Sequence, residues 1–350
     1  MSTEQEFKNE FSTSYLSNKD TTINLGGAVL SGACLGENFH VQLPLKYFNR
    51  HGLISGATGS GKTKSLQLLV EELSKNGVPS FLMDIKGDLS GLARAGSLNP
   101  RIETRHKEIN IPFTPQAFPV ELMSLTGASG LQLRTTIIEM GPILLAKALG
   151  LNDTQQSALS IIYKFCDDNA LALIDLKDMM SVLNYFDSST DPKLKEHYGD
   201  IPSATLSVIK RKIIALEGQG ANCIFSEPSF EPEDLLQIDR SGYGQVSILR
   251  LNDIQDKPEL FSTFVLSLLA EIYSTFPEMG DVTKPKLMIF IDEAHLFFKE
   301  ATKELLNQLD TMIKLIRSKC VCIVFITQYP NDVPENILGQ LGFKIQHSLR

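Results

Sequence analysis

Hydrophobic residues follow two different periods along much of the chain. Short, mainly apolar runs, which are typical of buried strands, lie at residues 53–55, 80–83, 246–251, 287–291 and 320–326. Between the first two runs, Leu66, Leu69, Val70 and Leu73 recur at the spacing of one face of a helix. A second long amphipathic helix is expected from Pro258 onward. This alternation of strands and helices predicts an α/β fold, with a parallel sheet flanked by helices.

The pattern divides the chain into three stretches. Residues 1–20 are polar and are expected to be frayed or loosely docked. Residues 21–48 carry short apolar runs broken by glycines, which predicts a small antiparallel β element. Residues 49–350 are expected to form the main domain.

Within the main domain, residues 100 to about 240 differ from the rest. Prolines punctuate 112–119, and helical patterns follow at 131–149, 154–166, 175–186 and 203–217. No catalytic pattern occurs in this stretch. We therefore expect a helical insertion in the α/β core.

Composition narrows the class of protein. The 350 residues are 43% hydrophobic, which suits one α/β domain with an insertion. No tract is long and apolar enough to cross a membrane, and the polar N-terminus lacks a signal-peptide pattern, so a cytoplasmic protein without a membrane partner is expected. The five cysteines are scattered and lack Cys-x-x-Cys spacing, which indicates free thiols.

The overall charge is acidic. A net charge of −8 and a pI near 5.4 argue against a surface coated in basic residues for nucleic acid. The densest basic cluster is Lys210-Arg211-Lys212, which fits a solvated helix face or a local DNA-binding channel.

A phosphate-binding pattern occupies residues 56–63, which read Gly-Ala-Thr-Gly-Ser-Gly-Lys-Thr and match Gly-x-x-x-x-Gly-Lys-[Ser/Thr]. Its glycines let successive backbone N–H groups point into one concavity at the start of a helix. Lys62 adds a positive charge for the phosphates, and the Thr63 hydroxyl is a ligand for Mg²⁺. The predicted nucleotide-binding residues are Gly56, Ala57, Thr58, Gly59, Ser60, Gly61, Lys62 and Thr63. The chain is therefore expected to bind a nucleoside triphosphate.

Acidic residues follow the apolar run at 287–291. Asp292 is placed to hold Mg²⁺ through water, and Glu293 to act as general base on the attacking water. The run at 320–326 ends in Thr327-Gln328, where Gln328 either contacts the γ-phosphate or lytic water or simply marks the end of a strand. The predicted catalytic residues are thus Glu293, Lys62 and Gln328.

Four stretches carry a resemblance to a known family: 51–63, 84–89, 290–297 and 315–334. They include an Asp-x-Lys-Gly-Asp element and a Thr-Gln element. With them, the chain resembles the HerA/FtsK branch of additional-strand P-loop ATPases, and is most similar to bacterial HerA-like proteins of the YjgR type. The resemblance implies a RecA-like core, ATP and Mg²⁺ as cofactors, and a homo-oligomeric, usually hexameric, ring acting on double-stranded DNA as a translocase or helicase.

The resemblance also bears on arginines and on the chain ends. Arg317 is the candidate for an arginine that completes a neighbouring subunit's site, although a cation at a helix C-terminus is an equal alternative. Arg350 is a second candidate. The N-terminal β element is shorter than the barrel of archaeal HerA, and residues 346–350 read as a segment that continues, which predicts a truncated C-terminus.

Other classes of nucleotide-binding protein fit less well. The letters Asp-Glu-Ala-His occur at 292–295, but the Ser-Ala-Thr element of such helicases lies before them, and no second motor domain follows. The base-reading element of GTPases and the signature of transporter ATPases are absent from the sequence. The remaining rival is a nucleotide-gated switch or scaffold that binds a protein partner without translocating DNA.

Overall fold

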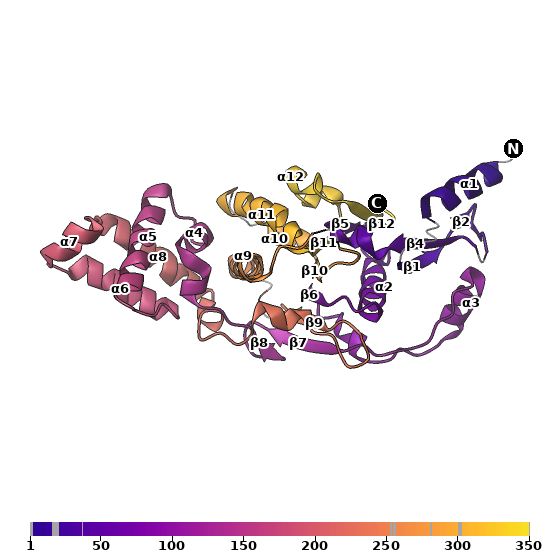
Figure 1. Ribbon diagram of the computed structural model, residues 1–350, viewed down its shortest axis with the longest axis horizontal. Coiled ribbons are helices and arrows are strands. Elements are labelled where there is room, and N and C mark those ends of the chain that lie inside the picture. The colour runs from indigo at the N-terminus through magenta and orange to yellow at the C-terminus, as the bar shows by residue number, and fades with distance from the viewer. Residues whose placement is uncertain are drawn as a thin grey trace.

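A parallel sheet of eight strands forms the centre of the protein (Figure 1). The computed structural model describes residues 3–15, 21–36, 38–252, 254, 257–280, 282–299 and 303–349. The strands are β5 (Gly52–Ser55), β6 (Ser80–Asp84), β7 (Val120–Ser124), β8 (Leu131–Gln132), β9 (Val246–Arg250), β10 (Leu287–Ile291), β11 (Val321–Thr327) and β12 (Phe343–Gln346). Their order is β12-β5-β11-β10-β6-β9-β7-β8, and each neighbouring pair is parallel. The expected α/β class is confirmed.

Both faces of this sheet are buried, which explains the unbroken apolar runs. Successive side chains of a strand point to opposite faces. In β10, Ile289 and Ile291 join one hydrophobic cluster, whereas Met288 and Phe290 join the other. The strand therefore needs apolar residues at every position rather than at alternate ones.

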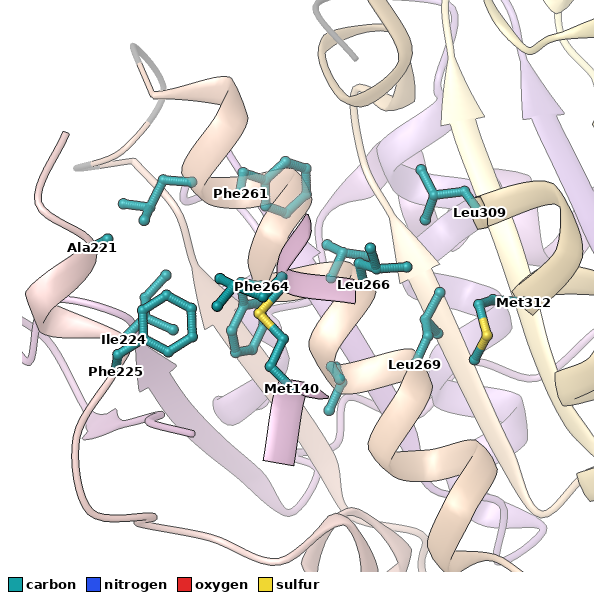
Figure 2. Close-up of a cluster of buried hydrophobic side chains, with 14 of the residues drawn as sticks. Met140, Ala221, Ile224, Phe225, Phe261, Phe264, Leu266, Leu269, Leu309 and Met312 are labelled. Atoms are coloured by element: carbon teal, nitrogen blue, oxygen red, sulfur yellow. The ribbon is translucent and has the colours of Figure 1, made fainter. Parts of the chain in front are cut away.

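Helices cover the two faces. The four apolar residues of α2 (Lys62–Lys75) that share one helical face pack in one cluster. The opposite face is covered by α9 (Pro258–Thr275), α10 (Ala294–Lys299) and α11 (Lys303–Ile316). Figure 2 shows α9 between two neighbours: Phe264 lies toward Met140, and Leu269 toward Leu309 and Met312. The short helix α12 (Glu335–Leu338) precedes β12.

A helical unit projects from the sheet beyond α9 (Figure 1). It contains α4 (Ile137–Ala148), α5 (Asp153–Asp168), α6 (Leu176–Ser188), α7 (Pro192–Tyr198) and α8 (Ser203–Gly218). The chain enters and leaves this unit at adjacent points, because Thr135 and Phe225 form a parallel bridge. The Thr135 N–H donates to Ile224 O at 2.9 Å, and the Ser226 N–H donates to Thr135 O at 3.0 Å.

The helical unit is shorter than the insertion expected over 100–240. Strands β7 and β8 fall inside that range but belong to the central sheet. These two strands are difficult to recognise from the sequence. Strand β7 follows a proline-punctuated stretch and has only two buried residues, and β8 is only two residues long. The helix expected over 131–149 accordingly begins at Ile137, and non-helical Gly141 (φ 72°, ψ 165°) kinks it.

The N-terminal element packs at the other end of the molecule (Figure 1). Strands β1 (Thr22–Gly27) and β4 (His40–Pro44) pair antiparallel, as do β2 (Val29–Leu30) and β3 (Ala33–Cys34). Helix α3 (Pro100–Ile109) contacts this element, where His40 Nε2 donates to Ile109 O at 2.8 Å. In the segment expected to be frayed or loosely docked, residues Thr3–Tyr15 form helix α1, and its buried Phe11 lies against Phe39 with ring centroids 5.9 Å apart and ring planes tilted by 57°.

Across the helices that the structure describes, none combines the length and the apolar character needed to span a membrane.

Candidate nucleotide-binding site

The predicted phosphate loop lies at the carboxyl end of β5 and leads directly into α2. Gly61, with φ 102°, caps the helix and adopts a left-handed conformation that favours glycine. Gly56 allows close packing, because a Cβ atom there would lie 2.4 Å from the Cβ of His347. The first N–H groups of α2 have no carbonyl partner within the helix, so this end suits an anion.

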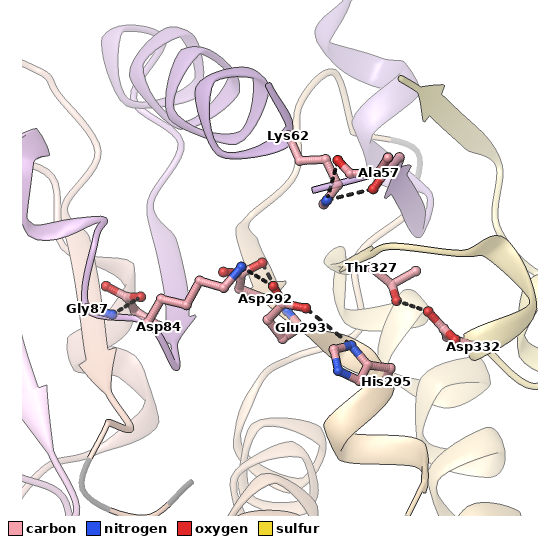
Figure 3. A network of polar contacts seen from close by, with 11 residues as sticks. Ala57, Lys62, Asp84, Gly87, Asp292, Glu293, His295, Thr327 and Asp332 are labelled. Carbon is pink, nitrogen blue, oxygen red and sulfur yellow. Dashed lines mark hydrogen bonds and ion pairs between the residues drawn. The ribbon is translucent and has the colours of Figure 1, made fainter. Parts of the chain in front are cut away.

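Lys62 is the first residue of α2 and is buried, with 8% of its surface exposed. Its ammonium donates to Gly56 O at 2.6 Å and to Ala57 O at 3.2 Å (Figure 3). The charge is therefore held across the loop itself. Thr63 follows in the first turn of α2 and is half-buried.

Asp292 and Glu293 follow β10 at the same edge of the sheet, and both are buried. Asp292 Oδ1 accepts the Glu293 N–H at 2.9 Å. Burial, and next the neighbouring Glu293 carboxylate, raises the pKa of Asp292 to about 6. Glu293 adopts a left-handed backbone conformation with φ 47°, which costs about 1–3 kcal/mol in a residue other than glycine. Backbone strain of this kind is most common at active sites, where it fixes the orientation of a functional side chain.

Two further aspartates lie beside Asp292. Asp84, at the end of β6, is fully buried and accepts the N–H groups of Gly87 at 2.7 Å and Leu89 at 3.0 Å. Oxygen atoms of Asp84, Asp88 and Asp292 all lie within 4.8 Å of one another. Burial, together with Asp84, raises the pKa of Asp88. Carboxylate oxygens are ligands that Mg²⁺ accepts, so these three residues could hold a cation.

Asp84 and Asp88 were not assigned a role from the sequence. Both belong to the Asp-x-Lys-Gly-Asp element that carried the family resemblance. The feature of the sequence that could have indicated a role for them is the position of this element directly after a predicted strand. Their proximity to Asp292 depends on the pairing of β6 with β10, which chain order does not reveal.

Glu293 has two positively charged or protonatable neighbours. Its Oε1 contacts the ammonium of Lys86, the lysine of the Asp-x-Lys-Gly-Asp element. Its Oε2 lies 3.2 Å from Nδ1 of His295 without the alignment of a hydrogen bond (Figure 3). The Lys86 ammonium and the Glu293 carboxylate thus form an ion pair within the site.

Gln328 lies between the phosphate loop and the acidic pair. It directly follows β11, whose neighbours are β5 on one side and β10 on the other. The preceding Thr327 is anchored, because its hydroxyl donates to Asp332 Oδ2 at 2.5 Å and its carbonyl accepts the Gly56 N–H at 3.3 Å. Gln328 itself is half-buried.

Arg317 is not part of this cluster. It is exposed and lies in the turn before β11, at the edge of the sheet opposite the phosphate loop. The seven residues of β11 span about 23 Å at 3.3 Å per residue. Arg317 therefore lies far from its own subunit's loop, and Arg350 lies outside the described residues.

The basic cluster on α8 is also remote, in the projecting helical unit. Lys210 donates to Asp187 Oδ2 at 2.8 Å, whereas Arg211 and Lys212 are exposed.

Comparisons with known proteins agree with this fold. The chain is 23% identical over 328 residues to the DNA double-strand break repair helicase HerA of Saccharolobus solfataricus, covering 91% of this chain and 58% of that protein. The chain thus spans less than two thirds of that relative.

Two solved structures share the fold at 15% identity. VirB4 of Thermoanaerobacter pseudethanolicus superposes with a TM-score of 0.57, covering 96% of this chain and 86% of that one. Plasmid coupling protein TrwB in complex with a non-hydrolysable ATP analogue also gives 0.57, covering 95% and 72%. The core is therefore a RecA-like P-loop NTPase fold.

A family model also matches most of the sequence. Residues 35–350 match the family described as helicase HerA-like C-terminal. This confirms the resemblance to the HerA branch, and the chain belongs to that HerA-like family.

Proposed function

We propose that this protein is a Mg²⁺-dependent ATPase and that it uses ATP hydrolysis to act as a motor on DNA. The observation that carries the proposal is the convergence of Lys62, Asp292 and Glu293 at one edge of the sheet, around the strand that ends in Gln328. A TrwB structure in complex with ADP and Mg²⁺ has the same fold, which supports the choice of cofactors.

Each residue of the site has a role in this proposal. The N–H groups of the loop and of the first turn of α2 bind the phosphates, and the Lys62 ammonium turns from the loop carbonyls toward them. Thr63 and Asp292 hold Mg²⁺, which neutralises charge on the phosphates when bound. Glu293 accepts a proton from the attacking water, and Gln328 orients that water or contacts the γ-phosphate.

Substitutions of Lys62 and of Glu293 should distinguish nucleotide binding from ATP hydrolysis. Lys62→Ala removes the charge that faces the phosphates, so nucleotide affinity and turnover both fall. Glu293→Gln keeps the shape but cannot accept a proton, so ATP binds and persists while turnover falls by about 10²–10⁴-fold. Equilibrium binding and phosphate release measure the two effects. Parental turnover in both variants contradicts the assignment of the site.

The proposed DNA motor rests on the HerA relative, which is a DNA double-strand break repair helicase. We propose that the protein acts on double-stranded DNA as a homo-oligomeric, hexameric ring. The rival is a nucleotide-gated switch that binds a protein partner, which the net charge of −8 favours. Duplex DNA should stimulate ATP hydrolysis at low salt in the motor, whereas hydrolysis unaffected by DNA supports the switch.

A further inference from the structure

The segment that follows β12 is bonded along the outside of the phosphate loop. The His347 N–H donates to Ser55 O at 2.7 Å, and the Ala57 N–H donates to Ser348 O at 2.8 Å. The His347 ring adds a third contact, from Nδ1 to Ser60 O at 3.0 Å. This segment therefore fixes the start and the middle of the loop.

The contact with Ser60 determines which ring nitrogen of His347 carries the proton. A carbonyl oxygen only accepts hydrogen bonds, so Nδ1 must be the donor. In the neutral imidazole, Nε2 is then an acceptor with a free lone pair. Nε2 is shielded from solvent and has no hydrogen-bond partner in the described part of the chain. A shielded acceptor without a hydrogen-bond partner destabilises the protein by about 1–3 kcal/mol. A ligand that donates a hydrogen bond to Nε2 would remove this penalty.

The position of His347 identifies which part of a nucleotide lies nearby. Strand β12 pairs with β5 on the side away from β11 and β10. The terminal phosphate must lie toward Asp292 and Glu293, which follow β10. The phosphate next to the sugar, and the sugar itself, then lie toward the opposite flank. His347 occupies that flank, with its Cε1 3.7 Å from where a Cβ on Gly61 would lie.

We propose that His347 is a sugar contact of the bound nucleotide, with Nε2 accepting a hydrogen bond from a ribose hydroxyl. The inference rests on the proposed nucleotide binding and adds selectivity for ribonucleotides over deoxyribonucleotides. Phosphate oxygens cannot satisfy a bare acceptor, because they carry no hydrogen at neutral pH. The amino group of adenine can donate, but it lies farther from the phosphates than the sugar does.

Two substitutions separate the sugar contact from the support of the loop. The shorter amide of His347→Asn can donate to Ser60 O in place of Nδ1 but has no counterpart of Nε2. The longer amide of His347→Gln carries an oxygen toward the Nε2 position. The experiment measures dissociation constants of the parent and both variants by calorimetry with Mg²⁺ and ADP, 2′-deoxy-ADP, 3′-deoxy-ADP and inosine diphosphate.

The parent should bind one of the two deoxy analogues about fivefold more weakly than ADP, the size of one neutral hydrogen bond. His347→Asn should lose this preference while binding that analogue as the parent does, and His347→Gln should keep part of it. Inosine diphosphate keeps both hydroxyls, so the parent should not discriminate against it through His347, and His347→Asn should weaken its binding by the same factor as that of ADP.

Three results overturn the sugar contact while leaving nucleotide binding intact. In the first, the parent binds ADP and both deoxy analogues equally. In the second, His347→Asn weakens every nucleotide by the same factor, which assigns the residue to loop support alone. In the third, the parent binds inosine diphosphate more weakly than ADP and His347→Asn abolishes that difference, which assigns a base contact. A parent that binds none of the four nucleotides instead overturns the proposed function.

Discussion

At the scale of single residues, His51 joins three elements of the core. Its Nε2 donates to Ile313 O of α11 at 2.8 Å, and its Nδ1 accepts the Ile323 N–H of β11 at 3.0 Å, while the residue itself precedes β5. Both ring nitrogens are therefore used in the neutral form. Burial is the main cause that lowers the pKa of His51 to about 4, and the nearby Arg317 charge acts in the same direction.

Replacing this histidine should weaken the fold. His51→Leu leaves the Ile323 N–H and the Ile313 carbonyl buried without their partner, so the free energy of unfolding should fall by about 2–4 kcal/mol. Urea denaturation measures this loss. The exposed His197 provides a matched control, because His197→Leu should change stability by about 0.5 kcal/mol or less.

The pH dependence of stability gives a separate test of His51. The folded pKa of about 4 lies below the value of 6.5 expected when unfolded, so protonation favours the unfolded chain. The contribution of His51 to stability should be full above pH 6.5 and should decline as the pH falls toward 4, by up to about 3 kcal/mol. This part of the decline should be absent in His51→Leu. An unchanged slope between pH 6.5 and 4 contradicts a buried neutral histidine.

Some residues of the candidate site could be recognised from the sequence, and others only from the structure. Lys62, Thr63, Asp292 and Glu293 could be assigned candidate roles from the sequence because each role goes with a local pattern after a predicted strand. Asp84, Asp88 and His347 gained their candidate roles only from the structure. Their positions depend on β6 pairing with β10 and β12 pairing with β5, and sheet order is a long-range property.

At the scale of elements, a polar network joins the helical unit to the core. The Thr135 hydroxyl lies 2.5 Å from Glu271 Oε1 of α9 and 3.1 Å from Glu139 Oε2 of α4. A hydroxyl has one hydrogen and cannot donate to both carboxylates. A protonated Glu271 resolves this, since it donates to Thr135, which donates to Glu139. Burial raises the pKa of Glu271 to about 7, with the Glu139 and Glu231 charges adding to it.

Glu271→Gln should therefore remove a pH dependence. The folded pKa of about 7 lies above the unfolded value of 4.5, so the contribution to stability is full below pH 4.5 and is lost as the pH rises through 7. This contribution of up to about 3 kcal/mol should be lost over this range in the parent and be absent in the variant, so the difference in stability between the two should change by that amount. Denaturation at several pH values tests this, with exposed Glu278→Gln as the control. Parallel pH profiles for parent and Glu271→Gln contradict the protonated network.

Helices of the projecting unit were easier to predict than the strands beside it. Helix α5 begins with a capping box between Asn152 and Gln155, and α6 with one between Asp175 and Asp178. Such helices carry their start signal and their apolar period in the local sequence. Strand β8 has only two residues, so it offers no period to recognise.

At the scale of the whole molecule, the exposed Arg317 lies too far from the phosphate loop of its own chain to reach it. If it completes a neighbour's site, mixing inactive Lys62→Ala subunits with Arg317→Ala subunits should restore some hydrolysis, since some sites then combine an intact Lys62 with an intact Arg317. Phosphate release from the mixture measures this. Mixed assemblies that remain inactive assign Arg317 a structural role alone.

Binding of DNA, if it occurs through α8, should depend on salt. Arg211 and Lys212 are exposed, whereas Lys210 is paired with Asp187. Replacing both exposed residues by alanine should weaken binding of the assembled protein and reduce the slope of log affinity against log salt by about 1–2 per subunit that contacts DNA. The control is Lys164→Ala on α5, which should leave the slope unchanged. Equal slopes for parent and double variant place the DNA elsewhere.

The bridge between Thr135 and Phe225 has a consequence for how this architecture can diverge. Because the two ends of the helical unit are already neighbours, the intervening segment can be lengthened, shortened or exchanged at little cost in loop closure. The central sheet need not change its strand order. One condition remains on any replacement: it must cover Phe264 and the adjoining outer surface of α9, which α4 now buries. Descendants of a common ancestor should therefore vary most in residues 150–220 and least in the apolar residues that face α9.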